Sequence, residues 1–263
     1  MILRRSQGEL KLHVAIDVGA GPPVVLLHGV ASSSVTFANV VPLIQQNHRC
    51  IAIDLLGFGG SPIPENCDYT IGDHAAAVER AIRNLHLKTP FVLVGHSMGS
   101  LIAARLAART RLSIEKVVLV SPPIYLSPEE LSDKLDRGVM DFYLRAYKYV
   151  RENKEFTLRH AAIVERFLSI PKAMDINDRT WTPFVKSLKN SIESQTTISD
   201  LASITVPVDV IYGSLDEFHS EGVLKIVSRL SGVRTHRILG SDHLIGKRLA
   251  KATASAIEGT VVD

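Results

Sequence analysis

The segment Gly95-His96-Ser97-Met98-Gly99 places a serine midway between two glycines. An apolar run typical of a strand ends directly before it, and a run of small residues typical of a helix follows it. A serine at such a turn adopts a strained backbone conformation that exposes its hydroxyl, and the glycines let the strand and the helix approach closely. We therefore predict that Ser97 is a nucleophile.

A serine hydroxyl needs a positioned base to react at neutral pH, and histidine is the usual one. His243 is the leading candidate because it follows an expected strand at 235–239 and a glycine-containing turn, and we expect it to start the last helix. His219 and His236 are alternatives, but the first lies within a helical pattern and the second within a strand. We predict that His243 is the base.

A carboxylate must fix the tautomer of that histidine and stabilise its protonated form. Asp216 follows the strand before the last one, so we expect it at the same sheet edge as the serine. Glu217 is a nearby alternative, Asp242 adjoins the histidine in sequence, and Asp209 lies within a strand. Neighbouring side chains seldom point toward one another, and a strand aspartate is more often structural, so we predict Asp216 as the acid.

The elements that must position these residues alternate along the chain between short apolar runs and helical patterns. The apolar runs lie at 24–27, 50–53, 91–94, 117–120 and 208–212, and the helical patterns at 36–47, 70–86, 98–110, 219–230 and 243–258. Such alternation predicts an α/β fold with a doubly wound, mostly parallel sheet that is covered on both faces. Residues 10–18 are expected to add an antiparallel edge strand.

The alternation stops between residues 122 and 203, where helical patterns occur around 155–168 and 178–198 and no strand is expected. Ser127 and Pro128 have the sequence signature of a helix start. We predict an α/β core of residues 1–121 and 204–263 with an inserted all-helical cap at 122–203. The insertion is rich in aromatic residues, most of which are expected to form its own core and some of which are expected to line an apolar cavity.

Three features together resemble the α/β-hydrolase superfamily. They are the chain order Ser97, Asp216, His243, the segment Leu26-Leu27-His28-Gly29 at the end of a strand, and the turn 54–61 with the pattern D-x-x-G-x-G-x-S. The resemblance covers essentially the whole chain. It implies the α/β-hydrolase fold with a cap and a serine hydrolase, while the turn at 54–61 is expected to be structural.

The resemblance also implies an oxyanion hole, which is often the largest single contribution to catalysis of acyl transfer. By the family's geometry its two donors are the backbone N–H groups of Val30 and Met98. A single glycine, Gly29, stands in that loop, which in the family suits ordinary esters better than esters of bulky tertiary alcohols. His28 is expected to support the loop by hydrogen bonding.

The expected activity is the cleavage of carboxylic esters of small, largely uncharged substrates through an acyl-enzyme, in the manner of a carboxylesterase of class EC 3.1.1. A hydrolase of carbon–carbon bonds in ring-cleavage products is the alternative, but Leu244 stands where that group usually has tryptophan, and His96 precedes the serine. Thioesterase, lactonase and perhydrolase activities also stay open. A ligand-sensing receptor that retains the triad is an alternative of another class.

The composition of this 263-residue chain limits the classes of partner that we expect it to bind. Thirty basic and 27 acidic residues give a net charge of +3, which is too small and dispersed for a nucleic-acid groove or a membrane-binding patch. Cys50 and Cys67 cannot build a disulfide framework, and polar residues follow Arg4 and Arg5 where a secretory signal needs an apolar stretch. Metal-ligand and dinucleotide motifs are missing, so we expect no cofactor and no metal. The expected protein is cytoplasmic and acts on a small-molecule ester.

Overall fold

The computed structural model describes residues 10–125, 134–165, 174–194, 196–218 and 220–260. Seven strands form one sheet: β1 (Val14–Val18), β2 (Pro23–Leu27), β3 (Arg49–Ile53), β4 (Phe91–His96), β5 (Ile114–Val120), β6 (Val208–Gly213) and β7 (Val233–Ile238). Their order across the sheet is β1-β3-β2-β4-β5-β6-β7. β1 pairs antiparallel with β3, and the remaining pairs are parallel, which confirms the predicted fold class and edge strand.

The helical elements follow the predicted alternation. They are η1 (Ser34–Phe37), α1 (Val41–Ile44), α2 (Ile71–Asn84), α3 (Met98–Arg109), α4 (Lys134–Glu152), α5 (Lys154–Glu165), α6 (Trp181–Ser187), the π-helix η2 (Leu188–Ile192), α7 (Thr197–Ser203), α8 (Glu221–Val227) and α9 (Lys247–Glu258). Every described element between β5 and β6 is helical.

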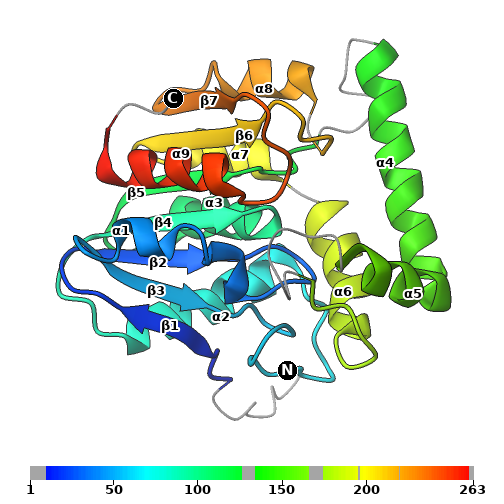
Figure 1. Ribbon diagram of the computed structural model, residues 1–263, viewed down its shortest axis with the longest axis horizontal. Coiled ribbons are helices and arrows are strands. Elements are labelled where there is room, and N and C mark those ends of the chain that lie inside the picture. The colour runs from blue at the N-terminus through cyan, green and yellow to red at the C-terminus, as the bar shows by residue number, and fades with distance from the viewer. Residues whose placement is uncertain (1–9, 126–133, 166–173, 195, 219, 261–263) are drawn as a thin grey trace, which may run out of the picture.

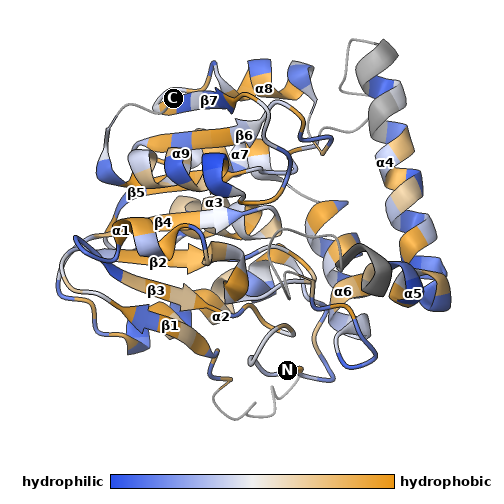
Figure 2. Cartoon of the chain, in the orientation of Figure 1, coloured by the Kyte–Doolittle hydropathy of each residue, from blue (hydrophilic) through white to orange (hydrophobic). Residues whose placement is uncertain are grey.

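The two central strands β2 and β4 are buried along their whole length, which explains why their sequences are almost entirely apolar, whereas the edge strands β1 and β7 are partly exposed and carry polar residues. In β2, Val24 and Leu26 belong to the buried cluster that includes residues of α1 and α9 on one face, while Val25 and Leu27 belong to the cluster that includes residues of α2 and α3 on the other. The central strands are accordingly coloured mostly in orange tones in Figure 2. Strands covered on both faces lose the polar alternation of a half-exposed strand.

The carboxyl ends of the parallel strands meet at one edge of the sheet. Leu27 lies beside Gly95, and His96 lies beside Val120. Figure 1 shows α4, α5 and α6 beside this edge, whereas α1 and α9 lie over one face of the sheet. The last helix of the insertion, α7, packs on the core helix α3, and Asp200 of α7 bonds Arg105 of α3 at 2.7 Å.

Several helix boundaries differ from the prediction, and three of the differences have a bearing on the packing or the site. The helix expected at 36–47 is divided into η1 and α1, because Pro42 cannot donate a hydrogen bond to a preceding turn and is tolerated only where a helix begins. In place of the helix expected at 178–198, the structure has two consecutive elements, α6 and η2, which end at Ile192. The next helix, α7, begins separately at Thr197. The last helix begins at Lys247 because Gly246 is its N-cap, so His243 lies in the preceding loop.

The predicted helix start at Ser127 lies outside the described residues. Among the helices that the structure describes, none is long and apolar enough to cross a lipid bilayer.

Candidate active site

Ser97 lies at the sharp turn between β4 and α3, as predicted. Its backbone has φ 52° and ψ −125°, a conformation that non-glycine residues rarely adopt. A Cβ atom on Gly95 would lie 2.3 Å from the carbonyl oxygen of Gly99, and one on Gly99 would lie 2.2 Å from that of Leu27. The turn therefore requires glycine on both sides, and the strained serine projects from it toward the edge of the sheet.

His243 lies in the loop between β7 and α9 and reaches the serine from there. The hydroxyl of Ser97 lies 3.0 Å from Nε2 of His243, and Nδ1 of the same ring lies 3.0 and 3.1 Å from the two carboxylate oxygens of Asp216. The carboxylate can only accept, so Nδ1 carries the proton and Nε2 is free to accept the serine proton. The three residues form one continuous row of hydrogen bonds.

Asp216 follows β6 and is 5% exposed. Burial alone would raise the pKa of its carboxyl, but the hydrogen bond and charge of His243 and the backbone N–H of Phe218 outweigh burial and lower the pKa to about 2. The N–H of Phe218 donates to the carboxylate across 3.0 Å. The carboxylate is thus ionised at neutral pH and held in place from two sides.

The alternatives from the sequence lie elsewhere. Glu217 and Asp242 are exposed. Asp209 and His236 bond one another at 2.9 Å within the sheet, where Asp209 also pairs with two basic side chains. His219 lies outside the described residues.

His96 is a neighbour of His243 for which the sequence predicts no contact. Its Nε2 lies 2.9 Å from the carbonyl oxygen of His243, and the two rings lie 5.2 Å apart. Burial lowers the pKa of His96 to about 3, so the ring is neutral and Nε2–H donates to that carbonyl. The G-x-S-x-G pattern leaves this position unspecified, and only the fold brings it to His243.

The loop after β2 passes directly beside Ser97. A Cβ atom on Gly29 would lie 3.0 Å from Cβ of Ser97 and 3.4 Å from its Oγ. Val30 follows Gly29 in this loop, and Met98 is the first residue of α3, where a backbone N–H has no acceptor within the helix. The two expected oxyanion donors therefore belong to two segments that adjoin Ser97, one next to it in the chain and one next to it in space.

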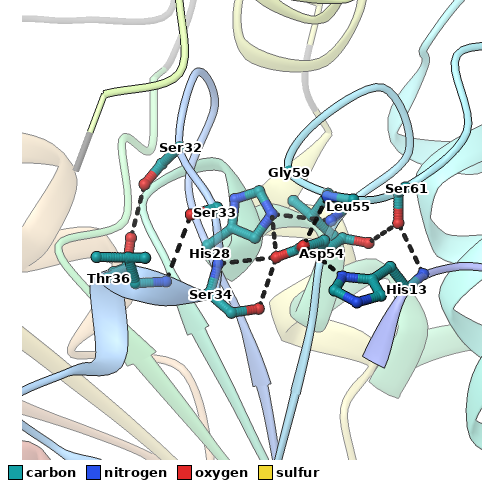
Figure 3. Close-up of polar contacts among 12 residues, drawn as sticks. His13, His28, Ser32, Ser33, Ser34, Thr36, Asp54, Leu55, Gly59 and Ser61 are labelled. Atoms are coloured by element: carbon teal, nitrogen blue, oxygen red, sulfur yellow. Dashed lines mark hydrogen bonds and ion pairs between the residues drawn. The ribbon is translucent and has the colours of Figure 1, made fainter. Parts of the chain in front are cut away.

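His28 supports this loop through hydrogen bonds of its ring (Figure 3). Its Nδ1–H donates to the carbonyl oxygen of Gly29 across 2.7 Å, and its Nε2 accepts from the N–H of Leu55 across 2.8 Å. Burial lowers the pKa of His28, which keeps the ring neutral. With both ring nitrogens bonded to backbone, His28 supports the loop as expected from the sequence.

Asp54 holds the far end of the same loop. Its buried carboxylate accepts from the N–H and the hydroxyl of Ser34 at 2.9 and 2.7 Å, from the N–H of Gly60 at 2.9 Å and from Nδ1 of His13 at 2.9 Å. Burial opposes ionisation, but these hydrogen bonds outweigh it and lower the pKa of Asp54. Figure 3 shows this carboxylate at the centre of the network.

Aromatic side chains from the insertion cover the loop that carries Asp216. Tyr143 of α4 donates its hydroxyl to the carbonyl oxygen of Glu217, and its ring lies 5.9 Å from that of Phe218. The hydroxyls of Tyr125 and Tyr147 lie 2.8 Å apart. Burial raises the pKa of both, so these hydroxyls are uncharged. Within the described residues, no three histidine, cysteine or acidic side chains are grouped to hold a metal ion.

A model of the α/β-hydrolase fold family matches residues 22–246. Because this match spans most of the sequence, the chain belongs to the α/β-hydrolase fold family, as its fold and the order of its site residues indicate.

Individual relatives match shorter stretches. Probable lysophospholipase BODYGUARD 4 of Arabidopsis thaliana is 39% identical over 109 residues, which are 41% of this chain and 26% of the plant protein. The serine hydrolase-like protein of Danio rerio is 34% identical over 150 residues, 56% of this chain and 45% of the fish protein. The chain thus spans less than half the length of these two relatives.

A solved esterase, EaEST from Exiguobacterium antarcticum, shares the fold with a TM-score of 0.76. The match covers 94% of this chain and 95% of the esterase at 20% sequence identity.

Proposed function

We propose that this protein is a serine hydrolase that cleaves carboxylic esters of small, largely uncharged substrates through an acyl-enzyme. The observation that carries the proposal is the hydrogen-bonded row Ser97, His243, Asp216, with distances of 3.0 Å on both sides of the imidazole. A nucleophile, a base and an orienting acid at these distances are the working parts of acyl transfer.

In the first half of the reaction, the Ser97 oxygen attacks the ester carbonyl while its proton passes to Nε2 of His243. The tetrahedral oxyanion is stabilised by the backbone N–H groups of Val30 and Met98. The bond to the leaving alcohol then breaks, and the alcohol oxygen takes the proton from His243. An acyl-enzyme on Ser97 remains.

In the second half, a water molecule gives a proton to Nε2 of His243 and attacks the acyl carbon. The bond between Ser97 and the acyl carbon breaks, the serine oxygen takes back the proton, and the carboxylic acid leaves. Asp216 stays ionised throughout and stabilises the imidazolium form of His243 in both halves.

The uncharged tyrosine hydroxyls and the aromatic cover of the acid loop support a substrate without strong charge. Cys50 and Cys67 are both free and buried, which is compatible with a reducing compartment, and we extend the proposal to a cytoplasmic enzyme.

The test is stopped-flow hydrolysis of p-nitrophenyl esters of graded acyl length. The proposal predicts turnover by the wild-type protein, with a burst of one nitrophenolate per chain wherever deacylation limits the rate, and no activity above background for Ser97→Ala. A wild-type protein that hydrolyses only a carbon–carbon ring-cleavage product would favour the other hydrolase class. Binding without repeated turnover would favour a ligand-sensing protein.

A further inference from the structure

The residue directly after the proposed oxyanion donor Val30 has a strained backbone. Ala31 has φ 54°, in the left-handed region that a residue with a Cβ atom adopts at an energetic cost. Such conformations persist only where the surroundings over-determine them. Ala31 is buried, so the groups that hold it must be other parts of the protein.

The contact that holds Ala31 comes from the insertion. The backbone N–H of Asp175, which lies in the segment leading to α6, donates to the carbonyl oxygen of Ala31 across 2.6 Å. This bond fixes the peptide group that follows Ala31, and with it the direction in which the loop leaves the oxyanion position.

The side chain of Asp175 fixes its own backbone in turn. One carboxylate oxygen accepts from the N–H of Gly59 across 3.0 Å, and the other accepts from the side-chain amide of Asn177 across 2.8 Å. The hydroxyl of Thr180 donates to the Asp175 carbonyl oxygen across 2.7 Å. Asp175 is therefore bonded through its N–H, its carbonyl and both carboxylate oxygens.

Gly59 belongs to the turn that Asp54 organises. Its φ is 53°, and a Cβ atom there would lie 2.3 Å from the Asp54 carboxylate, so only glycine fits. The guanidinium of Arg179 donates to the Gly59 carbonyl oxygen across 3.0 Å. The turn that contains Gly59 therefore contacts both residues that fix the loop after β2. Asp54 bonds Ser34 at the end of that loop, and Asp175 bonds Ala31 beside the proposed donor Val30.

We infer that Asp175 is a positioning residue for the oxyanion hole, through which the insertion controls the geometry of the Val30 N–H. The inference rests on the proposed function. A merely structural role for Asp175 would affect the whole fold, whereas its bond to Ala31 acts on the residue next to the proposed donor Val30. Loss of the Asp175 side chain should therefore weaken stabilisation of the oxyanion more than binding of the ester.

The experiment compares Asp175→Ala, Asp175→Asn and Asp178→Ala. The asparagine variant keeps an oxygen that can accept from Gly59. Asp178 is the matched control, because it lies in the same segment, has a side chain that is 86% exposed and pairs only with Lys154 among the contacts described for it. The readouts are kcat and KM for a p-nitrophenyl ester, both per active site titrated with a fluorophosphonate, and the affinity for a trifluoromethyl ketone, which forms an oxyanion on the serine.

Asp175→Ala should lower kcat by about 10- to 100-fold, since small displacements of catalytic groups have effects of this size. KM should change less than about twofold, and the affinity for the ketone should fall in parallel with kcat. Asp175→Asn should stay within about threefold of the wild type, and Asp178→Ala should match it. An unchanged kcat, a loss confined to KM, or an equal loss in Asp178→Ala would overturn the inference.

A second variant keeps the test decisive if Asp175→Ala folds poorly. Glycine adopts a positive φ without the steric cost of alanine. Ala31→Gly combined with Asp175→Ala should therefore recover part of the lost kcat, and no recovery per titrated site would overturn Ala31 as the residue through which Asp175 acts. A wild-type protein that neither hydrolyses esters nor reacts with the fluorophosphonate would instead refute the proposed function.

Discussion

The imidazole of His96 donates from Nε2 to the backbone carbonyl of His243 across 2.9 Å, so the residue before Ser97 holds the loop of His243. His96 is 5% exposed and its pKa is lowered to about 3, which keeps it a neutral donor at neutral pH. The Ser97 turn and the His243 loop are thereby joined by a bond outside the hydrogen-bonded row of Ser97, His243 and Asp216.

Replacing His96 tests this link. His96→Phe keeps a ring but removes the donor, and we expect kcat to fall about tenfold, the effect of one hydrogen bond of ordinary strength. His96→Gln can donate from a similar position and should retain most of the activity. Steady-state kinetics over a range of pH should show a displaced acid limb of kcat/KM in the phenylalanine variant only. Equal losses in both variants with unchanged profiles would mean that His96 only fills space.

Asp216→Asn tests the choice of the acid. The amide cannot fix the same tautomer of His243, so kcat should fall by about 10⁴-fold. Glu217→Gln, the neighbouring and exposed carboxyl, should be nearly silent. Because the pKa of Asp216 is lowered to about 2, its protonation should not contribute to any loss of wild-type activity above about pH 4. If Glu217→Gln caused the large loss and Asp216→Asn did not, the acid would be misassigned.

Acid should destabilise the fold through three buried histidines, His28, His74 and His96, whose pKa values burial lowers. An unfolded chain takes up protons at these histidines near pH 6.5, while His74 and His96 in the folded protein take them up only near pH 3. The unfolded state therefore binds more protons in this window, and the free energy of unfolding falls as pH falls.

Urea unfolding at several pH values measures this slope. Each such histidine contributes about 1.4 kcal/mol per pH unit within the window. His74→Gln should reduce the slope by about that amount, whatever its effect on stability at neutral pH. His86→Gln is the control because His86 is exposed, and it should leave the slope unchanged. An unaltered slope in His74→Gln would contradict the account.

The size of the substrate should depend on the insertion. An apolar site gains about 25 cal/mol for each Å² of ligand surface that it removes from water. Each added acyl methylene should therefore raise kcat/KM by up to a few-fold until the site is full, with an optimum at short to medium chains. Activity that rises steadily toward long chains with activation at a lipid surface, or strong selectivity for anionic esters, would contradict the expected small apolar site.

Much of the fold and the meeting of Ser97, His243 and Asp216 could be predicted because both depend on local patterns. Ser97 is marked by glycines that the turn requires, and parallel strands bring loops such as those of Asp216 and His243 to one edge. The start of α9 was predicted four residues too early because Leu244 and Ile245 fit an apolar helical pattern, although Gly246 is the N-cap.

Asp175 and His96 could not be found in this way. Each acts through a backbone group far away in the sequence, Ala31 in one case and His243 in the other. A hydrogen bond to a carbonyl oxygen makes no demand on the residue that carries the carbonyl, so the sequence has no paired signal. Such contacts become visible only when the three-dimensional arrangement of the loops is known.

The most direct test of the central claim is labelling with a fluorophosphonate followed by mass spectrometry of the peptides. The account predicts one label per chain, on Ser97, at a rate that falls steeply in Asp216→Asn. It also predicts that Ser97→Ala takes up no label and loses about three to six orders of magnitude in turnover while it stays folded. Stoichiometric labelling of another serine, or an active Ser97→Ala protein, would contradict the account.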